Sequence, residues 1–235
     1  MYKNKKILAL ITARKESKGL IRKNIKPFAG KPLIAWSIEE AKNSKYIDRV
    51  VVTTEDEGIA KISKKCGADV PFMRPRHLAL DNTKHIDVIL HSMLWLEENN
   101  KPYDLLVLLQ PTCPLRTSED IDNSIITLFQ KNAKAVVSVS EVEHPPYWDN
   151  ILPKNGCMKN FLRPDVIGKN RQELPTFYRI NGVIYVAYWD FLKRAKTFFG
   201  NQTYAYIIPK NKAVDIDDET DFKFAEFLMN YRRGR

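Results

Sequence analysis

A cluster of basic residues directly follows the first apolar segment of the chain. Residues 12–24, TARKESKGLIRKN, come after the apolar run Ile7–Thr12 and contain five lysines and arginines, one serine and one glycine. A triphosphate is bound by fixed positive charge, by hydroxyl or backbone donors and by a backbone that can approach it closely. The loop offers all three, but it has neither the GxxxxGK[ST] spacing of a Walker A loop nor the GxGxxG dinucleotide pattern. It indicates either a different kind of phosphate site or a solvated basic surface loop.

A second candidate segment is acidic and has the sequence VDIDDETD at residues 214–221. Side chains two residues apart in an extended segment share a face, so we expect Asp215 and Asp217 to point together. Paired carboxylates suit Mg²⁺, which adds waters and substrate phosphate oxygens to a few protein carboxylates. Acidic residues also cap helices. We assign that role to the later acids of the segment, Asp218, Glu219 or Asp221, and reserve Asp215 and Asp217 for the metal.

Three more polar side chains are candidates for binding a substrate. Gln110 ends the apolar run Leu105–Leu109, and the two prolines of the following PTCP turn stiffen its position. A side-chain amide at this position could form a hydrogen bond with a hydroxyl or carbonyl group of a substrate. Arg171 and Arg179 carry planar guanidinium groups that suit a carboxylate or a phosphate. The plainer interpretation is a rigid strand-to-helix turn and two surface arginines.

Other sequence features exclude several classes of protein. The chain has 235 residues, 44% hydrophobic and 28% charged, unlike disordered, collagen-like or coiled-coil chains. Its four histidines form no HExxH pattern and no GxSxG elbow is present, so a hydrolase has little support. Its three cysteines form no CxxC pair, so they are expected to be reduced thiols. No apolar run approaches the roughly 20 residues of a membrane span, and no signal peptide is recognisable, so we expect a cytoplasmic protein without a membrane partner.

The charge balance favours a polyanionic ligand. Lysine and arginine outnumber aspartate and glutamate by 38 to 28, a formal net charge of +10. Such a field attracts nucleic acids, membrane surfaces or small polyanions. The basic residues are dense at 3–6, 14–26 and 232–235, and no RRM, C2H2 or basic-leucine pattern accompanies them. Their concentration beside a glycine-containing loop favours a phosphorylated small molecule over a nucleic acid.

Strand and helix patterns alternate along the chain. Strands are predicted at residues 7–12, 49–54, 105–109, 135–140, 182–188 and 204–209. Helices are predicted at residues 32–43, 56–66, 86–98, 118–130, 189–196 and 222–231. This alternation predicts an α/β fold with a mostly parallel, doubly wound sheet covered on both faces. Ligands of such sheets bind at the carboxyl ends of the strands, where the three candidate segments above are expected to lie.

The pattern dissolves between residues 142 and 175. This stretch contains five prolines and no sustained period, which indicates a loop-rich insertion or lid rather than a second core. We therefore predict a single domain over residues 1–235 with a loop-rich insertion or small subdomain around residues 142–180.

Six segments, in this order, resemble the acylneuraminate cytidylyltransferases, which activate nonulosonic acids such as sialic acid. The opening motif of that family, approximately IPARxGSKGxxxKNI, stands here as ITARKESKGLIRKNI at residues 11–25. The other matches are VTTED at 52–56, RP and LA at 74–75 and 78–79, LQPTCPLR at 109–116, YRING at 178–182 and VDID at 214–217. The departures are Thr12 for a common proline, Lys15 and Glu16 for small residues and Cys113 for a common serine. Matches in this order over nearly the whole chain are specific.

The resemblance implies a role for each matched residue. The positions that hold the CTP phosphates correspond to Arg14, Ser17 and Lys23, and those near the cytosine and ribose to Asn24 and Arg74. The positions that face the acidic sugar correspond to Gln110, Arg171 and Arg179. The ligands of the Mg²⁺ cofactor correspond to Asp215 and Asp217. The implied catalytic set is Arg14, Lys23, Arg171, Asp215 and Asp217.

The implied reaction is cytidylyl transfer, in which CTP and a sialic, legionaminic or pseudaminic type of acid give a CMP-sugar and pyrophosphate. The implied fold is Rossmann-like with a small protruding subdomain through which the family forms homodimers. Two alternatives stay open. One is another nucleotidylyltransferase that uses Kdo or a phosphorylated acceptor. The other is a non-catalytic nucleotide- or RNA-binding module, which the net charge of +10 favours.

Overall fold

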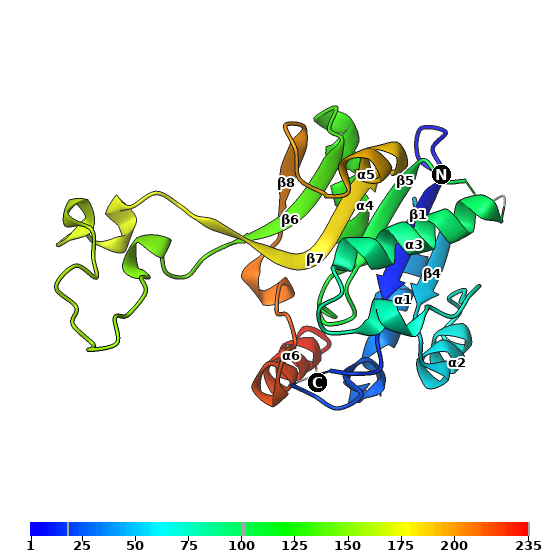
Figure 1. Cartoon of the computed structure of the whole chain (residues 1–235), viewed down its shortest axis with the longest axis horizontal. Helices are drawn as coiled ribbons and strands as arrows, with labels where there is room; N and C mark the ends of the chain where they lie inside the picture. The colour runs from blue at the N-terminus through cyan, green and yellow to red at the C-terminus, as the bar shows by residue number, and fades with distance from the viewer. Residues whose placement is uncertain (18, 100–101, 235) are drawn as a thin grey trace.

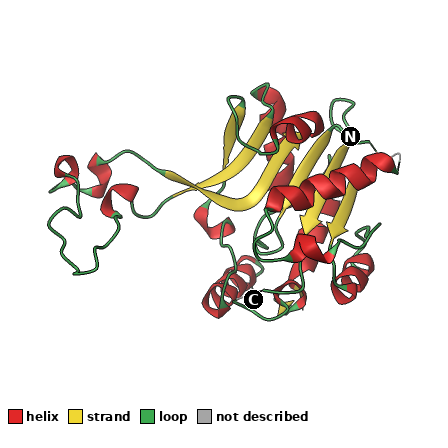
Figure 2. Ribbon diagram, in the orientation of Figure 1, coloured by secondary structure: helices red, strands yellow, loops and turns green. Residues whose placement is uncertain are grey.

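A six-stranded sheet forms the centre of the computed structural model, which describes residues 1–17, 19–99 and 102–234 (Figures 1 and 2). Its strands, in spatial order, are β4 (Arg49–Thr53), β1 (Ile7–Thr12), β5 (Leu105–Leu109), β7 (Tyr178–Tyr188), β6 (Ala135–Glu141) and β8 (Thr203–Ile207). The pairs β1–β4, β1–β5 and β6–β8 are parallel, whereas β7 runs antiparallel to both β5 and β6. The prediction of a mostly parallel α/β sheet is confirmed, and β7 is its one reversed strand.

Helices cover both faces of this sheet. They are α1 (Leu33–Asn43), α2 (Glu57–Lys65), α3 (His85–Glu98), α4 (Ser118–Gln130) and α5 (Trp189–Ala195), whereas α6 (Glu219–Arg232) packs in a separate cluster with Phe28 and Trp36. Apolar side chains of α1, α2 and α4 pack on one face, and those of α3 and α5 pack on the other. Strands between two helical layers are buried on both sides, which is why β1 and β5 are continuous apolar runs.

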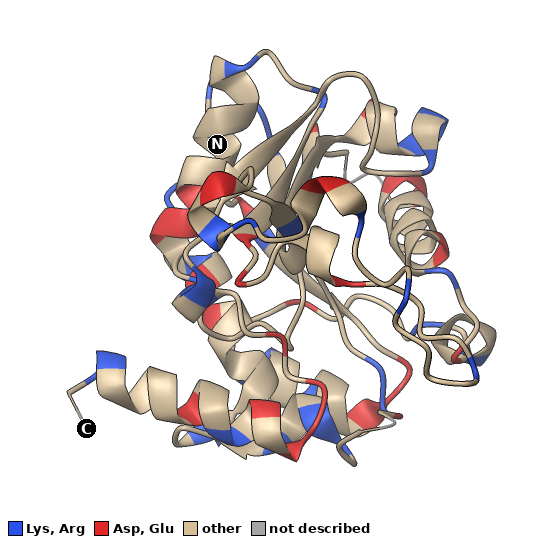
Figure 3. Ribbon diagram, turned by 90° about the vertical axis from the view of Figure 1, so that its left-hand side faces the viewer, with Lys and Arg blue, Asp and Glu red and all other residues tan. Residues whose placement is uncertain are grey.

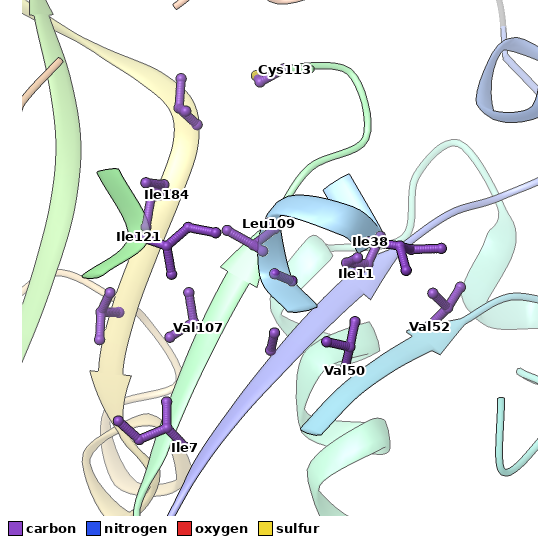
Figure 4. Close-up of a cluster of buried hydrophobic side chains, with 14 of the residues drawn as sticks. Ile7, Ile11, Ile38, Val50, Val52, Val107, Leu109, Cys113, Ile121 and Ile184 are labelled. Atoms are coloured by element: carbon purple, nitrogen blue, oxygen red, sulfur yellow. The ribbon is translucent and has the colours of Figure 1, made fainter. Parts of the chain in front are cut away.

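Side chains of alternate residues in β1 belong to different cores. Ile7 and Ile11 lie in the cluster shown in Figure 4, together with Val107 of β5 and Ile38 of α1. Leu8 and Leu10, whose side chains point to the other face of the sheet, pack against α3 and α5 instead. Each fully buried aliphatic side chain contributes about 1.5–3 kcal/mol. The two cores therefore hold the strand ends rigidly, and the loops that follow them start from fixed positions.

An arm of residues 142–177 extends away from the sheet between β6 and β7 (Figure 1). It has no strand or α-helix and contains only the short 3₁₀ helices η3 (Pro146–Trp148), η4 (Pro164–Val166) and η5 (Arg171–Glu173). The arm leaves the sheet through the long ends of β6 and β7, which pair with each other outside the body of the molecule.

Most predicted element boundaries lie within two residues of the observed ones, but the starts of two elements differ by three or more residues. β7 begins at Tyr178, four residues before the expected Gly182, because Tyr178 to Ile180 pair with the end of β6 while staying exposed and so show no apolar alternation. α6 begins at Glu219 rather than at 222. Its start is set by Asp218, whose carboxylate accepts hydrogen bonds from the backbone N–H groups of Thr220 and Asp221, in agreement with the capping role expected for this acid.

In the described part of the chain, no helix is long and apolar enough to cross a membrane. Acidic and basic segments are interspersed over the face shown in Figure 3, and no single basic face stands out there.

Candidate active site

Three segments that are far apart in the sequence meet at the carboxyl ends of β1 and β5. They are the basic loop after β1, the turn 110–116 after β5 and the acidic segment before α6. The backbone N–H of Ile216 donates to the carbonyl oxygen of Thr112 over 2.9 Å, which joins the turn to the acidic segment. The Lys23 ammonium donates to the carbonyl oxygen of Ile216 over 2.5 Å, which joins the basic loop to the same segment. The convergence that was predicted from the carboxyl-end rule for parallel strands therefore occurs.

A basic cleft of about 300 Å³ lies over the end of β1. Its walls include six of the residues singled out in the sequence, Arg14, Ser17, Lys23, Asn24, Arg74 and Gln110. Apolar side chains of Leu78 and Val88 line the same cleft. The acids Glu16 and Asp81 also line it, and a cleft that combines cations with apolar side chains can take the phosphates and the base of a nucleotide.

Lys23 lies where the basic loop meets the acidic segment. Lys23 is only 8% exposed, and its ammonium is 3.3 Å from the Asp217 carboxylate. Gly19 brings the two backbones together, because a Cβ at this position would collide with the carbonyl oxygen of Asp217. The lysine is thus held between the cleft and a carboxylate, where it can bind an anion and orient Asp217.

The other polar residues of the cleft fix the loop as well as line it. The Asn24 side chain donates to the carbonyl oxygen of Arg14 over 2.9 Å, and the Arg14 guanidinium pairs with Asp81 at 2.7 Å. Arg74 is buried and donates both to the carbonyl oxygen of Ala13 and to Glu55. Neither acid was identified from the sequence, because Asp81 and Glu55 act through contacts with residues more than 15 positions away.

A second, larger cleft of about 780 Å³ adjoins the first and contains the acidic pair. Asp215 and Asp217 are both exposed and both line it, while Ile216 between them is buried in the core beneath α6. The two carboxylates therefore face one cavity, as alternation in an extended segment predicts. Arg179 lines the same cavity, which places a cation opposite the acids.

Gln110 and Arg171 have different surroundings. The Gln110 side chain lies in the basic cleft against Gly182, where a Cβ would come within 3.2 Å of its Nε2. Gly182 also has φ +74°, so two independent constraints favour glycine at this position. Arg171 lies on the arm, 3.6 Å from Glu141, and lines neither cleft of this chain. The structure brings nine of the ten candidate residues into the two adjoining clefts and leaves Arg171 outside them.

The donor set at the acidic segment suits a hard divalent cation that is completed by other ligands. Within residues 1–17, 19–99 and 102–234, no group of three or more His, Cys, Asp or Glu side chains could hold a metal. Two carboxylates that face a solvent-filled cleft leave most positions of an octahedral ion for water and phosphate oxygens, which is the usual arrangement for Mg²⁺.

His85 is a residue of the basic cleft that sequence reasoning missed. Its Nε2 lies 2.8 Å from the Thr12 hydroxyl, at the position where the family motif has proline. Solvent reaches the ring, but the cleft walls displace much of the water around it. This desolvation lowers the pKa of His85, and the nearby Arg74 lowers it further. A neutral imidazole at neutral pH offers one donor and one acceptor to a ligand.

The lowered pKa of His85 predicts a pH-dependent stability. Below its ordinary value near 6.5, the unfolded chain binds a proton that the folded chain resists, so the free energy of unfolding decreases as the pH falls. His85→Asn removes this component. In urea unfolding, we expect the free energy of unfolding of the wild type to exceed that of the variant by less at about pH 5.5 than at pH 7.5. A difference that is constant with pH would contradict the neutral state of His85.

Comparisons with known proteins agree with this geometry. The family model for cytidylyltransferases matches residues 8–232. The chain is 36% identical over 224 residues to the post-translational flagellin modification protein B of Campylobacter coli, covering 95% of this chain and 94% of that protein. It is 32% identical over 231 residues to the CMP-N,N'-diacetyllegionaminic acid synthase of Legionella pneumophila, covering 95% and 96% of the two chains.

Two further similarities extend this finding. The chain is 36% identical over 222 residues to the N-acylneuraminate cytidylyltransferase of Escherichia coli, covering 94% of this chain and 51% of that protein. Among solved structures, the fold is similar to a CMP:2-keto-3-deoxy-manno-octonic acid synthetase complexed with CTP. The TM-score is 0.72 at 16% identity, over 97% of this chain and 99% of that one.

Proposed function

This chain belongs to the cytidylyltransferase family, and we propose that it transfers CMP from CTP to a nonulosonic acid of the sialic, legionaminic or pseudaminic type, releasing pyrophosphate. One observation carries the proposal: a basic cleft and a cleft with paired carboxylates meet at the Lys23–Asp217 contact. The relatives that are 30% or more identical over nearly the whole chain include synthases and cytidylyltransferases for all three types of acid.

The basic cleft would hold the nucleotide. Arg14, Ser17 and Lys23 offer two cations and a hydroxyl to the triphosphate, and the apolar wall with Leu78 offers a surface for the base. The anomeric hydroxyl of the sugar attacks the α-phosphorus, and the bond from that phosphorus to the bridging oxygen of the pyrophosphate breaks. Because this transfer needs mainly positioning and neutralisation of charge, fixed cations beside the leaving group are the chief contribution of the chain.

The acidic pair would hold Mg²⁺ where the two clefts adjoin. Asp215 and Asp217 are the carboxylates that fit it, and Lys23 keeps Asp217 turned toward the cleft. When bound, the ion neutralises phosphate charge and lowers the pKa of a coordinated hydroxyl. Gln110 lines the basic cleft and Arg179 the cleft with the carboxylates, and they would orient the hydroxyl and carboxylate groups of the acceptor.

We expect Arg179→Met to raise the KM for the acidic sugar by about 30-fold, because one charge-assisted pair with its carboxylate contributes about 2 kcal/mol. The KM for CTP should change less than about threefold, because Arg179 does not line the basic cleft. Arg163→Met is the matched control, since Arg163 is exposed on the arm and pairs with Asp165. Steady-state kinetics with both substrates varied provides the measurement. An equal rise of both KM values would contradict the assignment.

The arm supports the proposal that the enzyme is a homodimer. It extends from the body and exposes several large apolar side chains, Ile151, Leu152, Met158 and Ile167. Arg171 sits on the same arm outside this chain's own clefts, so a second copy is where it would reach an acceptor. A monomeric mass in sedimentation equilibrium would contradict this arrangement.

Because CTP is drawn from the cytoplasmic pool, we place the reaction in the cytoplasm.

Pyrophosphate release tests the whole proposal. The purified protein is incubated with each nucleoside triphosphate, Mg²⁺ and a panel of acids that includes sialic, legionaminic and pseudaminic acid and Kdo. We expect release with CTP and one nonulosonic acid, and loss of the activity when the metal is chelated. Turnover with Kdo alone would identify the other acceptor class. RNA binding that weakens steeply with salt, in the absence of CTP binding, would contradict an enzymatic role.

A further inference from the structure

Arg116 is a fully buried cation that the proposed reaction does not use. It is 0% exposed, and its guanidinium bonds only to neutral groups, the carbonyl oxygen of Gln110 and the hydroxyl of Ser37 at 3.1 Å. Its Nε has no hydrogen-bond partner. The carboxylates of Glu40, Asp120 and Asp215 lie near enough to favour its charged form, but the guanidinium makes no hydrogen bond to any of them among the described residues. Burial lowers the pKa of Arg116 to about 10, so the side chain is still charged at neutral pH.

A charge in this position destabilises the fold unless its contacts compensate. Removing a guanidinium from water has a penalty of several kcal/mol, and apolar side chains of similar volume often replace buried ions without loss of stability. Leu115, the neighbour of Arg116 in the turn 110–116, packs in an apolar cluster with Phe28 and Ile216. Stability alone therefore does not account for Arg116, and its hydrogen bonds indicate a different purpose.

The first bond of Arg116 fixes the end of β5. The carbonyl oxygen of Gln110 accepts hydrogen bonds from Arg116, from the Ser37 hydroxyl at 3.4 Å and from the backbone N–H of Cys113 at 3.3 Å. Pro111 follows and restricts the chain further. With its carbonyl held by three donors, the Gln110 backbone cannot rotate, and its side chain is directed into the basic cleft against Gly182.

The same turn supports the acidic segment from its other side. The Thr112 carbonyl oxygen accepts from the Ile216 backbone N–H at 2.9 Å, and the Cys113 Sγ lies 3.8 Å from the Asp215 carboxylate. The turn therefore contacts both Asp215 and the backbone between the two carboxylates, while Lys23 and Asp221 hold Asp217 from the other side. Arg116 lies at the end of that turn, directly before the helix cap at Thr117, and bonds back to its beginning.

We propose that Arg116 is a positioning residue. By closing the turn 110–116, it keeps the Gln110 side chain and the carboxylates of Asp215 and Asp217 in the relative positions that the transfer requires. This inference rests on the proposed function for its catalytic consequence. Its structural part concerns the rigidity of the turn and can be measured without any substrate.

Arg116→Met tests the catalytic consequence, since methionine keeps much of the apolar volume and removes the donors. We expect kcat/KM for the acidic sugar to fall by about 30-fold, a typical effect of losing a positioning contact, while the Kd of CTP changes less than about threefold. Arg232→Met is the matched control. Arg232 donates from α6 to the carbonyl oxygen of Leu115 over 2.9 Å, in the same turn but outside both clefts. We expect its kinetics to be unchanged.

Amide hydrogen exchange tests the structural part in the free protein. In Arg116→Met, the amides of Cys113 and Ile216 should exchange at least about tenfold faster, because both bond to carbonyl oxygens of the loosened turn. Arg232→Met should leave them unchanged. Two results would overturn the proposal. One is that the Cys113 and Ile216 amides exchange at the wild-type rate in Arg116→Met. The other is that kcat/KM of this variant decreases only in proportion to the fraction of protein that is folded. A wild-type protein without turnover would instead contradict the proposed function, while the exchange result still decides the role of Arg116.

Arg116→Lys and Ser37→Ala keep the proposal testable if methionine prevents folding. A lysine can donate to the Gln110 carbonyl oxygen but cannot also reach Ser37 with a second planar donor, so partial recovery of kcat/KM is expected. Ser37→Ala removes one of the three donors to that carbonyl and should lower kcat/KM by about threefold in the same direction. Wild-type activity in both variants would overturn the positioning role.

Discussion

Asp215→Asn is expected to lower kcat by about 1,000-fold, because it would remove a ligand of the proposed Mg²⁺ and with it the neutralisation of charge that develops in the transition state. The amide keeps the size of the side chain, but it removes the negative charge that a divalent cation needs. Asp215 is exposed, and within the described residues its carboxylate accepts a hydrogen bond only from the Cys113 thiol at 3.8 Å, so the fold should not depend on it. Steady-state kinetics at saturating CTP and Mg²⁺, together with a thermal melt, provides the measurement.

Glu219→Gln is the control for this carboxylate. Glu219 lies in the same acidic stretch and pairs with Lys26 at 2.8 Å, but it lines neither cleft. We expect its kcat to stay within about twofold of the wild type, since Glu219 contacts neither cleft and exposed ion pairs contribute little to stability. An Asp215→Asn variant that turns over at the normal rate and still needs Mg²⁺ would show that the ion binds elsewhere.

The sequence predicts the elements of this fold well where its patterns are local. The bounds of β1, β5 and α4 agree with the prediction to the residue, because each is a buried run or an amphipathic helix with clear turn residues at its ends. The carboxyl-end rule for parallel strands also brings the basic loop and the Gln110 turn together before any coordinate is known.

What could not be predicted depends on pairing between distant parts of the chain. The insertion of β7 between β5 and β6, antiparallel to both, has no signal in its own residues, since alternation does not encode strand direction. Arg116 is charged and would be assigned to the surface by type, yet it is fully enclosed. Its role follows only from contacts with Ser37 on α1 and Gln110 in the turn after β5.

Lys23→Met is expected to lower kcat/KM by about 300-fold, within the range for loss of one fixed donor to developing charge. Two effects combine in this variant. The cleft loses a cation that is available to the pyrophosphate, and Asp217 loses the partner that lies 3.3 Å from its carboxylate. The first effect weakens CTP binding, whereas the second lowers kcat at saturating CTP. The variant should therefore show both changes, in contrast to Asp215→Asn, in which CTP binding is largely retained.

Lys26→Met separates these effects from a general loss of positive charge. Lys26 is three residues away and pairs with Glu219 outside both clefts, so the variant has the same net charge as Lys23→Met without its contacts. Calorimetric titration of CTP into both variants, at two ionic strengths, gives the comparison. If both variants lose CTP affinity equally and the loss disappears at high ionic strength, then Lys23 acts only through the long-range electrostatic field of the basic loop. A loss confined to Lys23→Met and retained at high salt requires direct contact, which the buried position of its side chain between the two clefts favours.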